Sequence, residues 1–154
     1  MSFNFNIRTL DDEKDIPKLM DFLAKQDLGY PNYQDWLQRA EYEIYIGYKK
    51  PILASFDNYF IGDLIYQPHK ELPRTRELKN LRVHHDFRRR DIAHFMLNQA
   101  EVNDREEYDM LICDLHSNEL GMRHLLKSMN YEEIKTTNLY DKNVEDIVLV
   151  KNVA

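Results

Sequence analysis

The sequence contains a single cysteine, Cys113, which excludes an internal disulfide and a zinc site built from several cysteines. It also lacks any apolar run near the length of about 18 residues that a membrane-spanning helix needs. The first residues, MSFNFNIRTL, have neither the basic start nor the apolar stretch of a secretory signal. Together these absences predict a cytoplasmic protein in a reducing compartment, with no membrane partner.

Glycine and proline are scarce, and they form no linker, repeat or low-complexity tract. Hydrophobic residues make up 43% of the 154 residues, which is enough to bury one substantial core and argues against disorder. We therefore expect a single domain over residues 1–154.

Basic charge is also limited, because the formal net charge is -6 and the only dense basic run is Arg88-Arg89-Arg90. An acidic surface repels nucleic acid, so a nucleic-acid partner is not expected. Three arginines are too few for a nucleic-acid interface, but they can neutralise about one or two phosphate groups. The run therefore favours a small phosphorylated ligand.

The periodicity of apolar residues predicts alternating strands and helices. Strands are expected near Phe3–Ile7, Ile44–Tyr48, Ile52–Phe56, Tyr59–Tyr66, Thr75–Val83, Met110–Cys113, Tyr131–Lys135 and Val144–Val150. Helices are expected near Asp15–Leu23, with Asp15 as the N-cap, and near Asn32–Ala40, Asp91–Asp104 and Met122–Met129. This order predicts an α/β fold of the α+β kind, with a mixed, largely antiparallel sheet, a parallel strand pair in the middle and helices on both faces.

The segment Leu81–Ala93 joins the end of a strand, an arginine-rich turn and the start of a helix. The first turn of a helix leaves N–H groups without partners, and its dipole favours an anion there. Such a helix start can hold a pyrophosphate, and arginine side chains add charge-assisted bonds to it. Taken alone, the segment is equally compatible with a solvated arginine run beside a helix.

In context, the segment resembles the cofactor-binding segment of the GNAT superfamily of N-acetyltransferases. There, a strand ending in Leu-x-Val leads through Arg/Gln-x-x-Gly-x-Gly/Ala into a long helix, and an Asn-x-x-Ala motif and a Gly-Phe pair follow. Two stretches of this chain are similar: Leu81-x-Val83 with Phe87 and Arg88-x-x-Asp91-x-Ala93, and then Asn118-x-x-Gly121 with Asn130-Tyr131. The order of elements is similar over nearly the whole chain.

The resemblance implies acetyl-coenzyme A as the co-substrate, with its pantetheine arm on the strand end and its pyrophosphate at the start of the helix. The cofactor-binding residues that it implies are Leu81, Val83, Arg88, Arg89, Arg90, Asp91, Ile92, Ala93 and Asn118. For Asn118 the alternative is a cap on the helix that follows. The histidines lack the spacing of metal ligands, so no metal is expected.

Two departures from the family pattern bear on activity. Asp91 replaces a glycine that permits a positive φ and close approach of phosphate, so its carboxylate either turns away as a helix N-cap or weakens cofactor binding. Leu125 replaces a tyrosine that protonates the leaving thiolate in many relatives. These departures keep open an alternative function, a GNAT-fold module that binds acyl-coenzyme A as a sensor or scaffold. A third interpretation, a toxin that acetylates transfer RNA, conflicts with the acidic charge.

Acetyl transfer to a primary amine requires a proton acceptor. The resemblance implies Glu77 on the strand before the cofactor segment, and the alternative is a surface carboxylate. With Leu125 in place of the tyrosine, Ser117 is the candidate that helps the thiolate to leave. His116 follows a buried strand, where side chains often reach an active cleft, or else it is a loop histidine. Cys113, in an apolar run, is expected to be inert.

The acceptor is expected to be a small-molecule or peptidyl amine, and the acidic balance of the chain favours a cationic one. A homodimer is compatible with the sequence.

Overall fold

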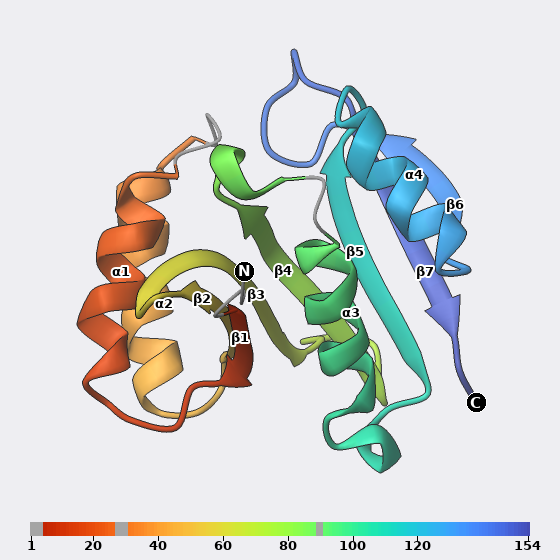
Figure 1. Cartoon of the computed structure of the whole chain (residues 1–154). Coiled ribbons are helices and arrows are strands. Elements are labelled where there is room, and N and C mark those ends of the chain that lie inside the picture. The colour runs from red at the N-terminus through yellow and green to blue at the C-terminus, as the bar shows by residue number, and fades with distance from the viewer. Residues whose placement is uncertain (1–4, 27–30, 89–90) are drawn as a thin grey trace. The chain divides into compact units, whose positions relative to one another are not determined.

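The computed structural model describes residues 5–26, 31–88 and 91–154, and Figure 1 shows the arrangement of their helices and strands. The strands are β1 (Phe5–Thr9), β2 (Lys50–Phe56), β3 (Tyr59–Pro68), β4 (Thr75–Val83), β5 (Met110–His116), β6 (Glu132–Thr137) and β7 (Asp146–Asn152). The α-helices are α1 (Asp15–Ala24), α2 (Tyr33–Tyr45), α3 (Ile92–Val102) and α4 (Leu120–Ser128), and short 3-10 turns occur at η1 (His85–Phe87) and η2 (Arg105–Glu107).

The strands form a seven-stranded mixed sheet in the order β1-β2-β3-β4-β5-β7-β6. Strands β4 and β5 run parallel, with Thr75 beside Met110 and Leu78 beside Cys113. Strand β5 pairs antiparallel with β7, and β7 with β6. The predicted mixed sheet with a parallel pair in its middle is confirmed.

The chain forms two compact units, each made from two stretches of sequence. The first unit comprises Met1–Gln67 and Asn80–Asn103, and the second comprises Pro68–Lys79 and Asp104–Ala154. Strand β4 contributes its first part to the second unit and its last part to the first. The expectation of a single domain over residues 1–154 stays a prediction.

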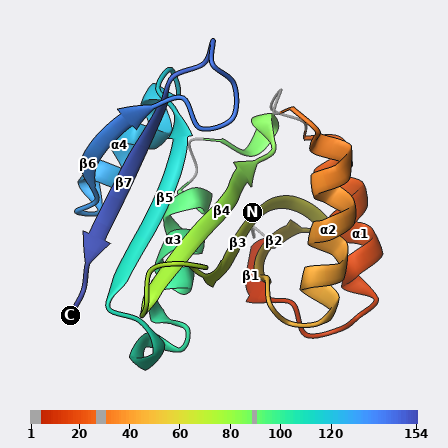
Figure 2. The same cartoon turned by 180° about the vertical axis from the view of Figure 1, so that it is seen from behind.

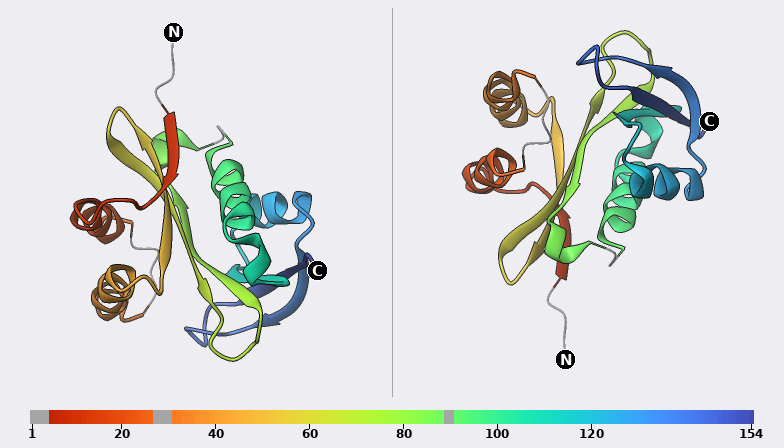
Figure 3. Two further views of the ribbon diagram at one scale, coloured as in Figure 1. Left: turned by 90° about the horizontal axis from the view of Figure 1, so that it is seen from below. Right: turned by 90° about the horizontal axis from the view of Figure 1, so that it is seen from above.

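In the first unit, α1 and α2 cover one face of the β1–β3 sheet and α3 covers the other, as Figure 3 shows. The core on the α1–α2 side joins apolar residues of both helices to Leu53 of β2 and Ile65 of β3. On β3, Gly62 leaves room for the neighbouring backbone, since a Cβ atom there would lie 2.9 Å from the Arg82 carbonyl oxygen and 3.1 Å from Cε of Met96. The close approach of β3, β4 and α3 therefore requires a glycine at this position.

In the second unit, α4 lies on one face of the strands β5, β7 and β6, and the view in Figure 2 shows the face that this helix leaves uncovered. Along β5, Leu111, Cys113 and Leu115 are buried, while the residues between them are only half-buried. This alternation gives the strand one apolar face and one face that carries polar side chains.

The most distinct error of the sequence prediction concerns Ile44–Tyr48, which was expected to form a strand. Helix α2 instead continues to Tyr45. Its buried residues Leu37, Ala40 and Ile44 follow helical spacing, whereas Tyr42 and Tyr45 are exposed. Packing of this stripe on the α1–α2 core therefore prevailed over the β propensity of the aromatic and branched residues.

The predicted turn between β2 and β3 is confirmed. Asp57 and Asn58 form it, with φ values of 49° and 70° that suit a tight hairpin.

The predicted N-cap of α1 is wrong. Asp15 lies in the first turn of the helix, and both of its carboxylate oxygens accept hydrogen bonds from Arg8, at 2.8 and 3.0 Å.

Among the described residues, the longest α-helix is α2, with 13 residues. In the part of the chain that the structure describes, none of the helices combines the length and the hydropathy needed to cross a membrane.

Candidate functional site

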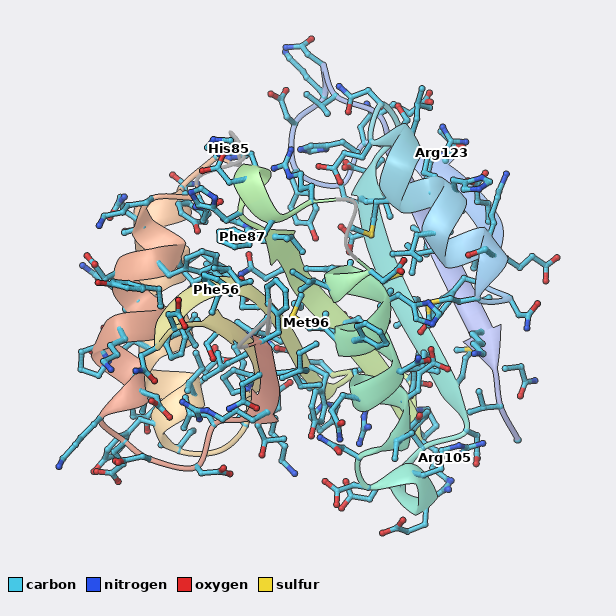
Figure 4. All side chains as sticks on the ribbon, viewed as in Figure 1. Phe56, His85, Phe87, Met96, Arg105 and Arg123 are labelled. Carbon is cyan, nitrogen blue, oxygen red and sulfur yellow. The ribbon has the colours of Figure 1, made fainter. Side chains whose placement is uncertain are left out.

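The predicted cofactor segment lies entirely in the first unit, where β4 leads through η1 into α3. The N–H of His84 donates a hydrogen bond to the carbonyl oxygen of Ile61 at 2.6 Å, which joins the strand end to β3. The ring of Phe87 packs against Phe56 with centroids 5.5 Å apart, and Figure 4 shows these two labelled side chains beside each other. These contacts fix the position of the turn that precedes the helix.

Arg88 is exposed at the end of this turn, and its Nε donates a hydrogen bond to the carbonyl oxygen of Val83 at 3.1 Å. A guanidinium group has five N–H donors, so one bond to the strand uses only part of its capacity. The same bond engages a carbonyl that the GNAT resemblance assigns to the pantetheine arm. Arg89 and Arg90, the other two predicted arginines, lie outside the described residues.

Asp91 is the N-cap residue of α3 and has a left-handed backbone, with φ 60° and ψ 14°. Only glycine adopts this conformation without cost, and aspartate tolerates it better than most residues. Asp91 therefore has the positive φ that the motif glycine permits in the GNAT family, as the sequence analysis considered. The Asp91 side chain is exposed, and among the described residues it makes no hydrogen bond that caps the helix.

The next two predicted cofactor residues lie in the first turn of α3, where Ile92 is buried and Ala93 is half-buried. On β4, Leu81 and Val83 are half-buried and alternate with Arg82, which is buried. The unit thus brings together the described members of the predicted segment at one strand end and one helix start.

A buried polar network lies behind this strand end. Asn80 lies within β4 with a left-handed backbone, at a φ of 60°, and its Nδ2 donates a hydrogen bond to Oδ2 of Asp63 at 2.9 Å. Arg82 donates from Nη1 to the hydroxyl of Tyr33 at 2.8 Å and also bonds the carbonyl oxygen of Gln26. The network connects β3 and β4 to helix α2 and the residues after α1.

The second unit carries a different cluster, the polar face, which comprises Glu77, Asp114, His116 and Asp146. Glu77 of β4 is beside Ile112 in the parallel register, and His116 of β5 is opposite Asp146 of β7. Because side chains two residues apart on a strand point to the same side, all four polar residues share one face. Glu77, the predicted proton acceptor, is therefore part of a larger constellation.

Interactions within the polar face show that its members are neighbours. Burial raises the pKa of Asp114, and the charges of Glu77 and Asp146 raise it further. The Lys79 ammonium and a hydrogen bond from Tyr140 act in the opposite direction and favour the ionised carboxylate.

The shortest contact of the polar face joins His116 and Asp146, whose Nδ1 and Oδ1 atoms lie 2.8 Å apart. Asp146 has no exposed surface, and its Oδ2 accepts a hydrogen bond from the Leu139 N–H at 3.1 Å. The sequence analysis raised His116 but missed Asp146. No local signal could have found it, because the two residues are 30 positions apart and meet only through the register of β5 and β7.

The two remaining predicted residues follow β5 in the second unit. Ser117 is half-buried, and its main chain bonds the carbonyl oxygen of Glu145 and the guanidinium of Arg123. Asn118 is exposed and precedes Glu119, the N-cap residue of α4, so the alternative role of Asn118 as the helix cap is wrong. Its predicted contact with the cofactor stays a prediction.

The expectation of no metal also stays a prediction. Within the described chain, His84, His85 and Asp86 each offer one ligand atom, and these atoms lie within 4.8 Å of one another. The Nδ1 of His84 accepts a hydrogen bond from the Asp86 N–H at 3.2 Å. Figure 4 shows the labelled His85 side chain at the edge of the first unit, and its exposed fraction is 73%.

Solved structures of acetyltransferases share this fold. A GNAT-family protein from Desulfovibrio desulfuricans superposes with a TM-score of 0.81 at 14% identity, covering 97% of this chain and 99% of the other. A GNAT family acetyltransferase from Elizabethkingia anophelis with acetyl-CoA bound gives 0.72 at 17%, covering 97% and 98%. The ribosomal-protein-alanine N-acetyltransferase from Brucella melitensis gives 0.71 at 18%, covering 96% and 99%.

At these identities the similarity establishes the fold, and the chain has the fold of GNAT acetyltransferases. No protein-family model matches the sequence, and no curated protein matches it.

Proposed function

We propose that the protein is an N-acetyltransferase that transfers the acetyl group of acetyl-coenzyme A to a primary amine of a small molecule or peptide. The observation that carries the proposal is the left-handed backbone of Asp91 between the β4 strand end and α3, at the place of the GNAT motif glycine. The fold and the acetyl-CoA-bound relative support the same activity.

The residues of the first unit fit coenzyme A. A helix start offers N–H groups and a favourable dipole to the pyrophosphate, and Arg88 adds a fixed positive charge beside it. The backbone of Leu81 and Val83 would pair with the pantetheine arm. One feature opposes binding, since the exposed Asp91 carboxylate stands at the same helix start.

The acetyl group would pass directly to the amine, without a covalent enzyme intermediate. Burial raises the pKa of the Cys113 thiol to about 12, and the charge of Asp114 adds to that rise. A thiol in this environment stays protonated near neutral pH and is a poor nucleophile. Direct attack within a ternary complex then remains, with the Ser117 hydroxyl as a proton donor for the thiolate.

A second candidate function is an acyl-coenzyme A sensor or scaffold. It is favoured by the carboxylate of Asp91 and by Leu125 at the place of the family's tyrosine. Under either function we propose a cytoplasmic protein without a nucleic-acid or membrane partner, and a homodimer is compatible with it.

Two measurements test the proposal. Isothermal titration calorimetry with acetyl-coenzyme A is expected to show binding, and its absence would contradict both candidate functions. Turnover is then measured on a panel of alkylamines, diamines and peptides with a free N-terminus, followed by release of the free thiol. Binding with turnover of at least one amine supports the enzyme, whereas binding with no turnover supports the sensor.

A further inference from the structure

We propose that His84, His85 and Asp86 bind a divalent transition-metal ion, for which Zn²⁺ is the natural probe. These three residues connect the end of β4 to η1, and all of them lie in the first unit. Such a site departs from the expectation of no metal, and it would exist whether or not the protein is an acetyltransferase. Three features of the turn support it.

The first feature is that the three side chains converge. A 3-10 turn has three residues per turn, so consecutive side chains normally point in directions about 120° apart. Here Nε2 of His85 lies 3.1 Å from Oδ1 of Asp86, and Nδ1 of His84 lies 3.8 Å from Oδ2 of the same carboxylate. His84 precedes the turn with a non-helical backbone, at φ -54° and ψ 135°, and its ring stacks on that of His85 with centroids 4.5 Å apart.

The second feature is the match between these separations and the size of a metal site. Zinc bonds to imidazole nitrogen and carboxylate oxygen are about 2.0–2.2 Å long, so neighbouring ligand atoms of a tetrahedral site are about 3.3–3.6 Å apart. The separations of 3.1 and 3.8 Å lie on either side of this range. The His85 and Asp86 side chains are 73% and 66% exposed, so small rotations of these two groups would complete the site.

The third feature is the state of the His84 ring. Its Nδ1 accepts a hydrogen bond from the Asp86 N–H at 3.2 Å, so this nitrogen presents a lone pair and carries no proton. The Oδ2 atom of the Asp86 carboxylate is also an acceptor, and two acceptors that face each other suit a cation between them. A metal would take the lone pair from the Asp86 N–H, because that bond is at the long end of the usual range and Asp86 is exposed to water.

The ligand types favour a transition-metal ion over a hard cation. Imidazole suits zinc, copper and nickel, whereas Mg²⁺ and Ca²⁺ prefer shells of oxygen ligands, for which one carboxylate provides too few atoms. Arg88 follows Asp86 by two positions and opposes a bound cation. Its side chain is exposed, so water and salt screen this repulsion.

The turn that carries the ligands is anchored to the rest of the first unit. The N–H of His84 donates to the carbonyl oxygen of Ile61 at 2.6 Å, and the N–H of Phe87 donates to the carbonyl oxygen of His84 at 2.8 Å. The Phe87 ring packs against Phe56 with centroids 5.5 Å apart. An ion would therefore bind to a backbone that is already in place, and the entropy cost of binding falls mainly on exposed side chains.

The first experiment titrates Zn²⁺ alone into the protein by calorimetry, in a buffer that does not chelate metals and with no histidine tag on the chain. We expect one ion to bind, and we expect Mg²⁺ to give no binding. His85→Ala and Asp86→Asn should each weaken Zn²⁺ binding by at least about 10-fold, since loss of a mere second-shell partner already costs that much. His124→Ala removes an exposed histidine of α4 and is the matched control, which should bind Zn²⁺ as the wild type does.

The second experiment identifies the ligand atoms directly. Nitrogen-15 NMR of the histidine rings should show Zn²⁺ shifting the signals of Nδ1 of His84 and Nε2 of His85, with the signals of His124 unchanged. His85→Ala and Asp86→Asn alter exposed side chains, so both are expected to fold, which circular dichroism checks. If either variant fails to fold, the ring signals of the wild type still decide whether these two histidines hold the ion.

Three results would overturn the proposed metal site. The first is no binding of Zn²⁺ at concentrations up to about 1 mM. The second is equal Zn²⁺ affinity in the wild type and in folded His85→Ala and Asp86→Asn, which would place the ion elsewhere. The third is Zn²⁺ binding that leaves the ring signals of His84 and His85 unshifted. Because the probe is the metal alone, these results leave the test of acetyl-coenzyme A binding and turnover unaffected.

Discussion

Asn80 donates a hydrogen bond from Nδ2 to Oδ2 of Asp63 at 2.9 Å, and this bond holds a carboxyl group that has no exposed surface. The other oxygen, Oδ1, has no hydrogen-bond partner in the described part of the chain, and neither has Nε of the buried Arg82. Burial raises the pKa of Asp63 to about 7, although the Arg82 charge and the Asn80 bond both oppose the rise.

The raised pKa of Asp63 predicts that stability decreases as pH rises. The folded protein holds this proton up to about pH 7, whereas the unfolded chain loses it near the ordinary value of 3.8. The stabilisation is therefore complete at low pH and is lost between these two values. We expect Asp63→Asn to flatten the fall in Tm between about pH 5 and 8. Equal pH slopes for the two proteins by thermal denaturation would contradict this.

Gly62→Ala is expected to destabilise the protein by roughly 1–3 kcal/mol, the usual cost of overpacking. Its new Cβ would meet the Arg82 carbonyl oxygen at 2.9 Å, and a backbone atom in a sheet cannot move away easily. Gly121→Ala is the matched control, because nothing lies within 4 Å of its Cβ position in α4. This control should be neutral or gain up to about 1 kcal/mol in helix propensity. Urea denaturation of both variants measures the difference.

Arg88→Ala is expected to weaken acetyl-coenzyme A binding by roughly 1.5–3 kcal/mol, the range for hydrogen bonds to charged groups. The loss should diminish with salt, because the interaction is ionic. Arg39→Ala, which removes an exposed arginine from α2, is the control and should leave the dissociation constant unchanged. Calorimetry at low salt that finds the same dissociation constant for Arg88→Ala and wild type would remove Arg88 from the cofactor site.

Asp91→Gly is expected to bind acetyl-coenzyme A more tightly than the wild type or equally well. The substitution removes a carboxylate beside the proposed pyrophosphate position and relieves a left-handed backbone at φ 60°. Asp104→Gly controls for the backbone effect, since Asp104 is also left-handed, at φ 49°, but lies before η2 in the second unit. Weaker binding by folded Asp91→Gly would show that the carboxylate is needed at this position.

Cys113→Ala is expected to retain activity, and the wild-type thiol should resist alkylation until the protein unfolds. The cause is the buried position of Cys113, which raises its thiol pKa to about 12. Reaction with a thiol-specific dye in native and denaturing buffer checks the second expectation. Acetylation of Cys113 by acetyl-coenzyme A without an acceptor, detected by mass spectrometry, would contradict direct transfer.

The arrangement of elements was largely predictable because each element carries its own periodicity. Strand β4 has the predicted bounds, and the Asp57-Asn58 turn marked the β2–β3 hairpin. The continuation of α2 to Tyr45 was not predictable locally, since Ile44 and Ile46 alternate with aromatic residues as in a strand. The helix is favoured because Leu37 and Ile44 are buried against residues of α1, and this packing is not visible in the local sequence.

The candidate site was predictable only in its contiguous part. The turn from Val83 to α3 is continuous in sequence, so a motif could indicate it, and the backbone of Asp91 agrees with the motif glycine. The pairing of His116 with Asp146 depends on the register between two strands and on the Leu139 N–H that occupies the second carboxylate oxygen. Such a pairing can be identified only when the fold is known.

Because β4 is divided between the two compact units, one unit is completely synthesised before the other during translation. All residues of the first unit have been synthesised when Asn103 is added, whereas the second unit still lacks β5, α4, β6 and β7. At roughly 5–20 residues per second, the ribosome needs several more seconds to supply them. During that interval the nascent chain holds the first part of β4, in which Thr75–Leu78 later pair with β5, without its partner strand.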